Sequence, residues 1–98
     1  MLFAVLYEYK NDPALISSVR PEHRQYLQKL LEQGSLMASG PLLDDSGALI
    51  IYQADNEPAV QQLIKNDPFH QHGIFRQWQI KPWKIVFGNR QLLPDGNS

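Results

Sequence analysis

The sequence predicts a single α+β domain whose elements follow one another in the order β-α-β-β-α-β. Three observations predict it. The chain has 98 residues, the length of one domain. Short runs rich in aromatic and β-branched residues alternate with stretches whose apolar residues recur at helical spacing. Proline, glycine, aspartate and asparagine separate these segments, where turns and helix ends are expected.

The first strand is predicted over residues 2–9, where both faces are apolar, as is typical of a central strand covered on both sides. Residues 10–18 contain an Asn-Asp-Pro sequence and are expected to form a loop. The first helix is predicted over residues 21–33, because Pro21 suits a first helical turn and Gly34 ends the apolar periodicity.

Two further apolar runs, residues 36–43 and 48–54, are joined by a short turn that predicts a β-hairpin. Asp55 or Asn56 can cap the second helix that follows. This helix is expected to end at Asp67, because a residue that precedes proline is disfavoured in helical geometry.

The last strand is predicted within residues 74–87, after a loop over residues 69–73. Pro82 inside this run indicates an edge position, a bend or a bulge, since proline cannot donate to a neighbouring strand. The domain is therefore expected to span residues 1–87, and residues 88–98 to form a polar C-terminal tail.

This order of elements is that of the ferredoxin-like fold, an antiparallel four-stranded sheet with two helices on one face. The helices run antiparallel, so the start of the first lies near the end of the second. Apolar residues on both faces of the first strand, with Trp78 and Trp83 in the last, suggest that the other sheet face is covered. A second copy of the chain is the simplest cover, giving a homodimer that packs sheet face to sheet face. A monomer with scattered surface aromatics is the alternative.

Composition excludes several classes of function. The net charge is -1 without a long run of one sign, which disfavours nucleic acid and anionic membranes as partners. The absence of cysteine excludes disulfides, thiolate metal sites and cysteine nucleophiles. No apolar run approaches the roughly 20 residues of a membrane span, and the N-terminus lacks the basic lead of a signal peptide. The expected location is cytoplasmic.

His23 and Asp67 are the main candidates for chemistry. His23 continues the apolar stripe of the first helix, and Asp67 continues that of the second, at ends that the fold brings together. A carboxylate beside an imidazole fixes its tautomer and favours proton exchange. The alternative is structural: Asp67 caps the backbone before Pro68, and His23 is a half-exposed residue of the first turn.

Other residues are weaker candidates. Arg20 precedes the predicted helix and can hold an anion near its N-terminus, or be a solvated surface charge. Gly40, between Ser39 and Pro41, allows a ligand close to the backbone near the end of the second strand, or marks a bulge.

No dedicated metal or cofactor is expected. Ser39 lacks the surroundings of a serine hydrolase, and no glycine-rich phosphate loop occurs. His70 and His72 stand two residues apart, without cysteines and with few nearby carboxylates at ligand spacing.

The stretch RPEHRQYLQKLLEQGSLMASGPLLDDSGALIIYQADN, followed by NDPFHQHGIF and WQIKPWKIVF, resembles the YciI-like, or YCII-related domain, proteins. The resemblance implies a dimeric α+β barrel with a His–Asp dyad, whose positions fall on His23 and Asp67. The residues that match the surrounding motifs are Arg20, Gly40, Pro41, Pro68 and Phe69.

The family's chemistry is mostly unassigned. It includes a dehydrochlorinase of a hydroxylated ring, and the wider superfamily includes muconolactone isomerase and monooxygenases without a dedicated cofactor. The resemblance thus implies proton transfer on a small cyclic or aromatic molecule, although fold does not fix function.

Three hypotheses follow. The first is a cofactor-independent lyase or isomerase in which His23 is the general acid/base, Asp67 orients it, and Phe69 and Tyr7 line the pocket. The second is a non-catalytic module that binds a small molecule or regulates a partner. The third makes the pair purely structural.

Overall fold

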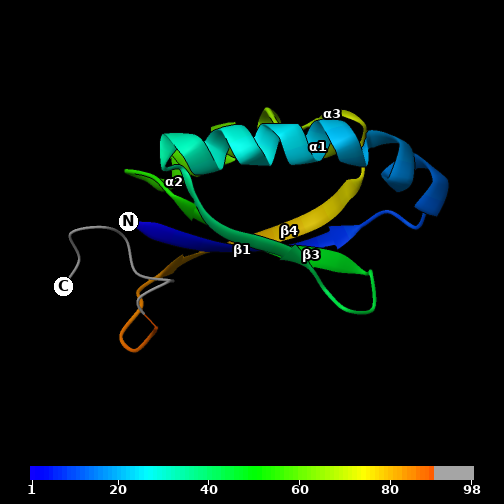
Figure 1. Ribbon diagram of the computed structural model, residues 1–98. Coiled ribbons are helices and arrows are strands. Elements are labelled where there is room, and N and C mark those ends of the chain that lie inside the picture. The colour runs from blue at the N-terminus through cyan, green and yellow to red at the C-terminus, as the bar shows by residue number, and fades with distance from the viewer. Residues whose placement is uncertain (90–98) are drawn as a thin grey trace.

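The predicted order of strands and helices is confirmed in the computed structural model, which describes residues 1–89. The elements are β1 (Leu2–Tyr9), α1 (Pro13–Gln33), β2 (Leu36–Pro41), β3 (Gly47–Gln53), α2 (Glu57–Lys65), α3 (Pro68–Gln71) and β4 (Phe75–Trp83). The strands form one antiparallel sheet in the order β2-β3-β1-β4, and the helices lie together on one face of it (Figure 1). This is the ferredoxin-like α+β fold. Residues 90–98 of the predicted tail lie outside the described residues.

The first helix is longer than the sequence analysis predicts. It begins at Pro13, not Pro21, so the prediction of a loop over residues 10–18 is wrong. The physical reason is a cap: the Asp12 carboxylate accepts the Leu15 N–H at 3.2 Å, and Pro13 takes the first position of the helix. Pro21 lies inside the helix, where it cannot donate to the preceding turn. The first turns bend away from the rest of α1 (Figure 1).

The second helix ends close to the predicted point, but a loop does not follow it. Asn56 caps α2 by accepting the Ala59 N–H at 2.9 Å. Asp67 then begins the one-turn helix α3, where the sequence analysis predicts a loop over residues 69–73. Pro68, which ends α2 as expected, is also well suited to the first turn of α3.

β1 is a central strand, as predicted, because it pairs with both β3 and β4. Phe3, Val5 and Tyr7 point toward the helices and are buried. Their β3 partners in the register lie on the same face, and Val60 and Ile64 of α2 complete the core above them. β4 is an edge strand, which explains how Pro82 is accommodated.

The opposite face of the sheet carries no helix in the part of the chain that the structure describes (Figure 1). Leu6 and Leu49 lie opposite each other on it and are 48% and 43% exposed. Trp83 of β4 is 47% exposed. Over residues 1–89, no helix combines the length and the hydropathy that a membrane crossing requires.

We predict that Gly47→Ala destabilises the protein by about 1–3 kcal/mol, because the new Cβ would overlap the carbonyl oxygen of Tyr7 on β1. Chemical denaturation measures the free energy of unfolding. Gly40→Ala is the matched control: nothing lies within 4 Å of its added Cβ, so we expect a change within about 0.5 kcal/mol. Equal stability of the two variants would contradict the close approach of β3 to β1.

Candidate functional site

The side chain of His23, on the buried face of α1, contacts that of Asp67, which precedes α3. Nδ1 of His23 is 2.7 Å from Oδ1 of Asp67, a hydrogen bond and, when the imidazole is protonated, an ion pair. Asp67 has no exposed surface and His23 is 7% exposed. His23 stands in the middle of α1, so the expectation of a first-turn residue is wrong, for the same reason that the helix begins early.

Asp67 is held by more than the histidine. Its Oδ1 also accepts the backbone N–H of Phe69 at 2.9 Å, which makes Asp67 the N-cap of α3. The local cap and the contact with His23, which the sequence analysis treats as alternatives, therefore share one oxygen atom. A buried carboxylate that accepts two N–H groups is fixed in position.

The ring of His23 stacks face to face on Phe69, with centroids 3.8 Å apart and planes at 3°. A carboxylate only accepts, so Nδ1 carries the proton of the hydrogen bond and neutral His23 has its lone pair on Nε2. Within residues 1–89, Nε2 has no hydrogen-bond partner, and His23 lines an open cleft. The arrangement presents a free imidazole nitrogen to whatever enters this cleft.

The cleft lies between α1 and the edge strand β2 and has a volume of about 620 Å³. Most residues that the sequence analysis selected line it: His23, Arg20, Ser39, Gly40, Pro41 and Phe69. Arg20 is half-buried and stands well inside α1, so the N-terminus of the helix is not what favours an anion beside it.

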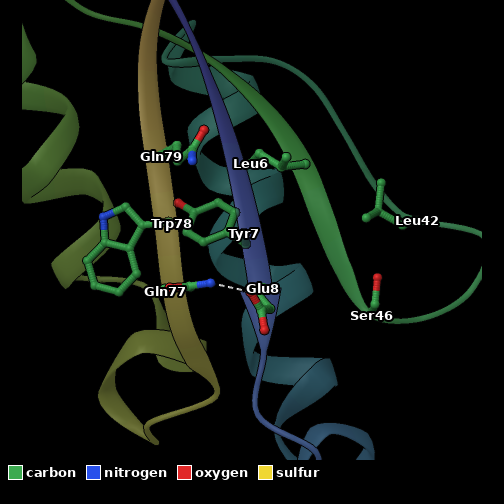
Figure 2. A pocket seen from close by; sticks show the side chains of 8 residues that line it. All are labelled: Leu6, Tyr7, Glu8, Leu42, Ser46, Gln77, Trp78 and Gln79. Atoms are coloured by element: carbon green, nitrogen blue, oxygen red, sulfur yellow. Dashed lines mark hydrogen bonds between the residues drawn. The ribbon is translucent and has the colours of Figure 1, made fainter.

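Tyr7 does not line this cleft. Its side chain is buried in the core, and its hydroxyl lies 2.5 Å from that of Tyr52. Burial raises the pKa of both hydroxyls far above the usual value. Tyr7 borders a separate recess of about 340 Å³, which Figure 2 shows with Leu6 and Glu8 of β1 beside Gln77 of β4. Phe69 is thus the aromatic residue of the predicted pair that reaches the site.

Several residues of the cleft were not predicted from the sequence, among them Tyr9, Arg24, Gln28 and Asp45. Arg24 and Gln28 continue the helical stripe of Arg20, a signal that the sequence contains. Burial raises the pKa of the Tyr9 hydroxyl, and the nearby Arg20 guanidinium partly offsets that rise. Asp45 comes from the β2–β3 turn, which only the folded hairpin brings to the cleft.

His70 and His72 lie on and after α3, away from the cleft. The His70 ring is 5.5 Å from Trp78, and His72 is exposed. Residues 1–89 contain no group of three or more histidine and carboxylate side chains placed to hold a metal ion.

A family model of the YCII-related domain matches residues 1–84 of the chain. The chain belongs to the family of YCII-related domain proteins, as the resemblance implied. Protein YciI of Escherichia coli is 31% identical over 80 residues, which are 71% of this chain and 82% of that protein. Protein YciI of Shigella flexneri gives the same values. An uncharacterized protein of Haemophilus influenzae is 29% identical over the same shares of both chains.

A solved structure with a similar fold is that of 5-chloro-2-hydroxyhydroquinone dehydrochlorinase (TftG) from Burkholderia phenoliruptrix, in complex with 2,5-dihydroxybenzoquinone. The two chains align with a TM-score of 0.76 and 26% sequence identity, over 86% of this chain and 94% of that chain. This neighbour is therefore an enzyme that acts on a small aromatic molecule.

We predict that Asp67→Ala lowers the free energy of unfolding by about 2–4 kcal/mol, because it removes a cap and leaves the buried Nδ1–H of His23 unpaired. Asn56→Ala is the matched control, since Asn56 caps α2 without a second contact. Its expected cost is about 1 kcal/mol. Urea denaturation compares the two variants, and equal losses would show that the His23 contact adds no stability.

Proposed function

We propose that the protein is a cofactor-independent enzyme, of lyase or isomerase type, that moves protons on a small cyclic or aromatic molecule. The observation that carries this proposal is the hydrogen bond between His23 and Asp67, with the second nitrogen of the imidazole at the wall of a cleft. A structural role alone does not require the opening beside Nε2. The cleft volume of about 620 Å³ has room for a ligand of one ring.

In the proposed mechanism, Nε2 of His23 is the general base. Asp67 accepts the Nδ1 proton, fixes the tautomer, and stabilises the imidazolium that forms when Nε2 takes a proton from the substrate. Phe69 holds the ring plane by stacking. The imidazolium then returns the proton to another substrate atom, or to the leaving group, so that no external reductant or oxidant is needed.

The substrate class is proposed from the structural neighbour. That enzyme removes the elements of HCl from a hydroxylated ring, and its bound ligand is a dihydroxylated quinone. At 26% identity the likeness supports a related class of ring compound without naming the substrate of this chain. Arg20, Ser39, Gly40, Pro41 and Phe69 are the proposed substrate-binding residues. The cytoplasmic location that the sequence suggests stays a prediction.

We predict that the protein catalyses hydrogen–deuterium exchange at the ring carbons of 2,5-dihydroxybenzoquinone, because a base that takes and returns a proton in D₂O replaces it with deuterium. Proton NMR follows the loss of the ring signal. His23→Ala should lower the catalysed rate by about 100-fold or more, and Asp67→Asn should lower it as well.

The matched control is His72→Ala, which removes an exposed imidazole outside the cleft and should leave the exchange rate unchanged. Circular dichroism checks that each variant is folded. Full exchange activity in His23→Ala would refute the assignment of the base. Tight binding of the quinone by the unaltered protein without any exchange would favour a non-catalytic binding module.

We also propose that the protein is a homodimer that packs through the open face of its sheet. This face exposes Leu6, Leu49 and Trp83, and it holds the recess drawn in Figure 2, where Gln77 donates a hydrogen bond to Glu8. Exposed leucines side by side on a sheet lose their contact with water when a second sheet covers them.

We predict that Leu6→Glu converts the dimer to a monomer, because a carboxylate in the centre of the interface would be buried without a partner. Size-exclusion chromatography with light scattering measures the mass. Leu31→Glu is the matched control: Leu31 is also 48% exposed but lies on α1, so the dimer should persist. A monomeric wild-type protein at micromolar concentration would overturn the proposal.

A further inference from the structure

Two arginines of α1 line the cleft beside His23, and their charges are not balanced within the described residues. Arg20 is half-buried and Arg24 is exposed. The ion pairs found among residues 1–89 join His23 to Asp67 and Arg76 to Glu8, so neither arginine of the cleft has a carboxylate within 4.0 Å there. A half-buried guanidinium without a carboxylate is an open site for an anion.

The helix itself supplies no partner for these charges. Arg20 and Arg24 are four residues apart, on one face of α1, where like charges repel each other. The positions three and four residues before Arg20 are Ser17 and Ile16, and those after Arg24 are Leu27 and Gln28, so none of them is acidic. The sequence thus places two repelling cations at the wall of the cleft.

The other walls contribute little negative charge. Asp45, in the β2–β3 turn, is the exposed carboxylate that lines the cleft. Asp67 is buried, and its Oδ1 accepts from His23 and Phe69. Tyr9, from β1, has a raised pKa because of its burial, so its hydroxyl is neutral at ordinary pH. Within the cleft, two guanidinium groups therefore face one surface carboxylate. Arg20 also borders a neighbouring recess with the carboxylates of Glu8, Asp12, Asp44 and Asp45, none of which lies within 4.0 Å of it.

We propose that the ligand of this cleft is a single-ring compound that carries an oxyanion, and that Arg20 binds this oxyanion with help from Arg24. The proposal rests on the site of the proposed function and names the charge of its substrate. The oxyanion is a carboxylate or an ionised ring hydroxyl, since a guanidinium donates two parallel hydrogen bonds to either.

The spacing on α1 fits a ligand of this size. Arg20 precedes His23 by three residues, which is a rise of about 4.5 Å along a helix. This is comparable with the separation between an oxygen on a six-membered ring and a carbon on its far side. An oxyanion at Arg20 and a reacting carbon at His23 can therefore belong to the same ring.

Isothermal titration calorimetry on the full chain tests the proposal with three probes. They are 2,5-dihydroxybenzoquinone, which has ionised ring hydroxyls at neutral pH, 2,5-dihydroxybenzoate, which has a carboxylate, and 2,5-dihydroxybenzamide, its neutral counterpart. We expect at least one anionic probe to bind about 10-fold or more tightly than the amide. The anion that binds better identifies the source of the oxyanion.

Arg20→Gln should weaken the binding of that anion by about 10–100-fold, and Arg20→Lys should weaken it less, because a lysine keeps the charge but loses the paired geometry. Arg24→Gln should have a smaller effect, since Arg24 is exposed. Arg76→Gln is the matched control: it removes the same charge from the ion pair with Glu8 and should leave binding unchanged.

Three results would overturn the proposal: no binding of any probe, equal binding of the amide and the anions, or unchanged affinity in Arg20→Gln. A different result would refute the proposed enzyme activity. Anion binding that depends on Arg20, without any deuterium exchange, would refute the catalytic function and leave the charge of the ligand standing. Deuterium exchange that depends on His23, with a binding affinity that does not depend on Arg20, would support the catalytic function and refute the proposed binding of an oxyanion by Arg20.

Discussion

The site depends on one oxygen atom, Oδ1 of Asp67. It accepts the N–H of Phe69, which begins α3, and the Nδ1–H of His23, which belongs to the middle of α1. These two bonds join segments that are far apart in the sequence, and they are formed in a place from which solvent is excluded. Because an unpaired buried carboxylate is costly, the loss of either donor lowers the stability of the fold. The orientation of the histidine is therefore part of the fold.

Sequence reasoning could predict much of this fold because its signals are local. Short apolar runs and the hairpin turn predicted the four strands, and the cap at Asn56 predicted the second helix. The start of the first helix was predicted too late in the chain because Pro21 also suits a first helical turn. Asp12 and Pro13 offer the same cap and first-turn proline earlier in the chain, and Ile16 and Val19 extend the buried stripe to them.

The pairing of His23 with Asp67 was predicted for a reason that is only partly correct. Antiparallel helices do bring the two regions together, but the meeting point on α1 is its middle rather than its start. The helical spacing of apolar residues was sufficient to place His23 on the buried face of α1, because this spacing does not depend on where the helix begins. The walls of the cleft could not be predicted in the same way, since Tyr9 and Asp45 reach it only through the register of β1 and the turn of the hairpin. Tyr7 lies on the same face as Tyr9, yet its hydroxyl pairs with that of Tyr52 in the core.

Aromatic packing beneath the histidine explains how one nitrogen stays free. Tyr7 stacks on Phe75 at 3.9 Å, Phe75 meets the edge of Phe69 at 5.8 Å, and Phe69 stacks on His23 at 3.8 Å. This series of rings runs from the central strand to the cleft and supports the imidazole by contact area. Phenylalanine rings offer no strong hydrogen-bond partner, so the support does not occupy Nε2. Asp67 holds the imidazole through Nδ1, and stacking on Phe69 fixes the plane of the ring. These two contacts set the orientation of His23 and leave the lone pair of Nε2, on the side of the cleft, available for a ligand.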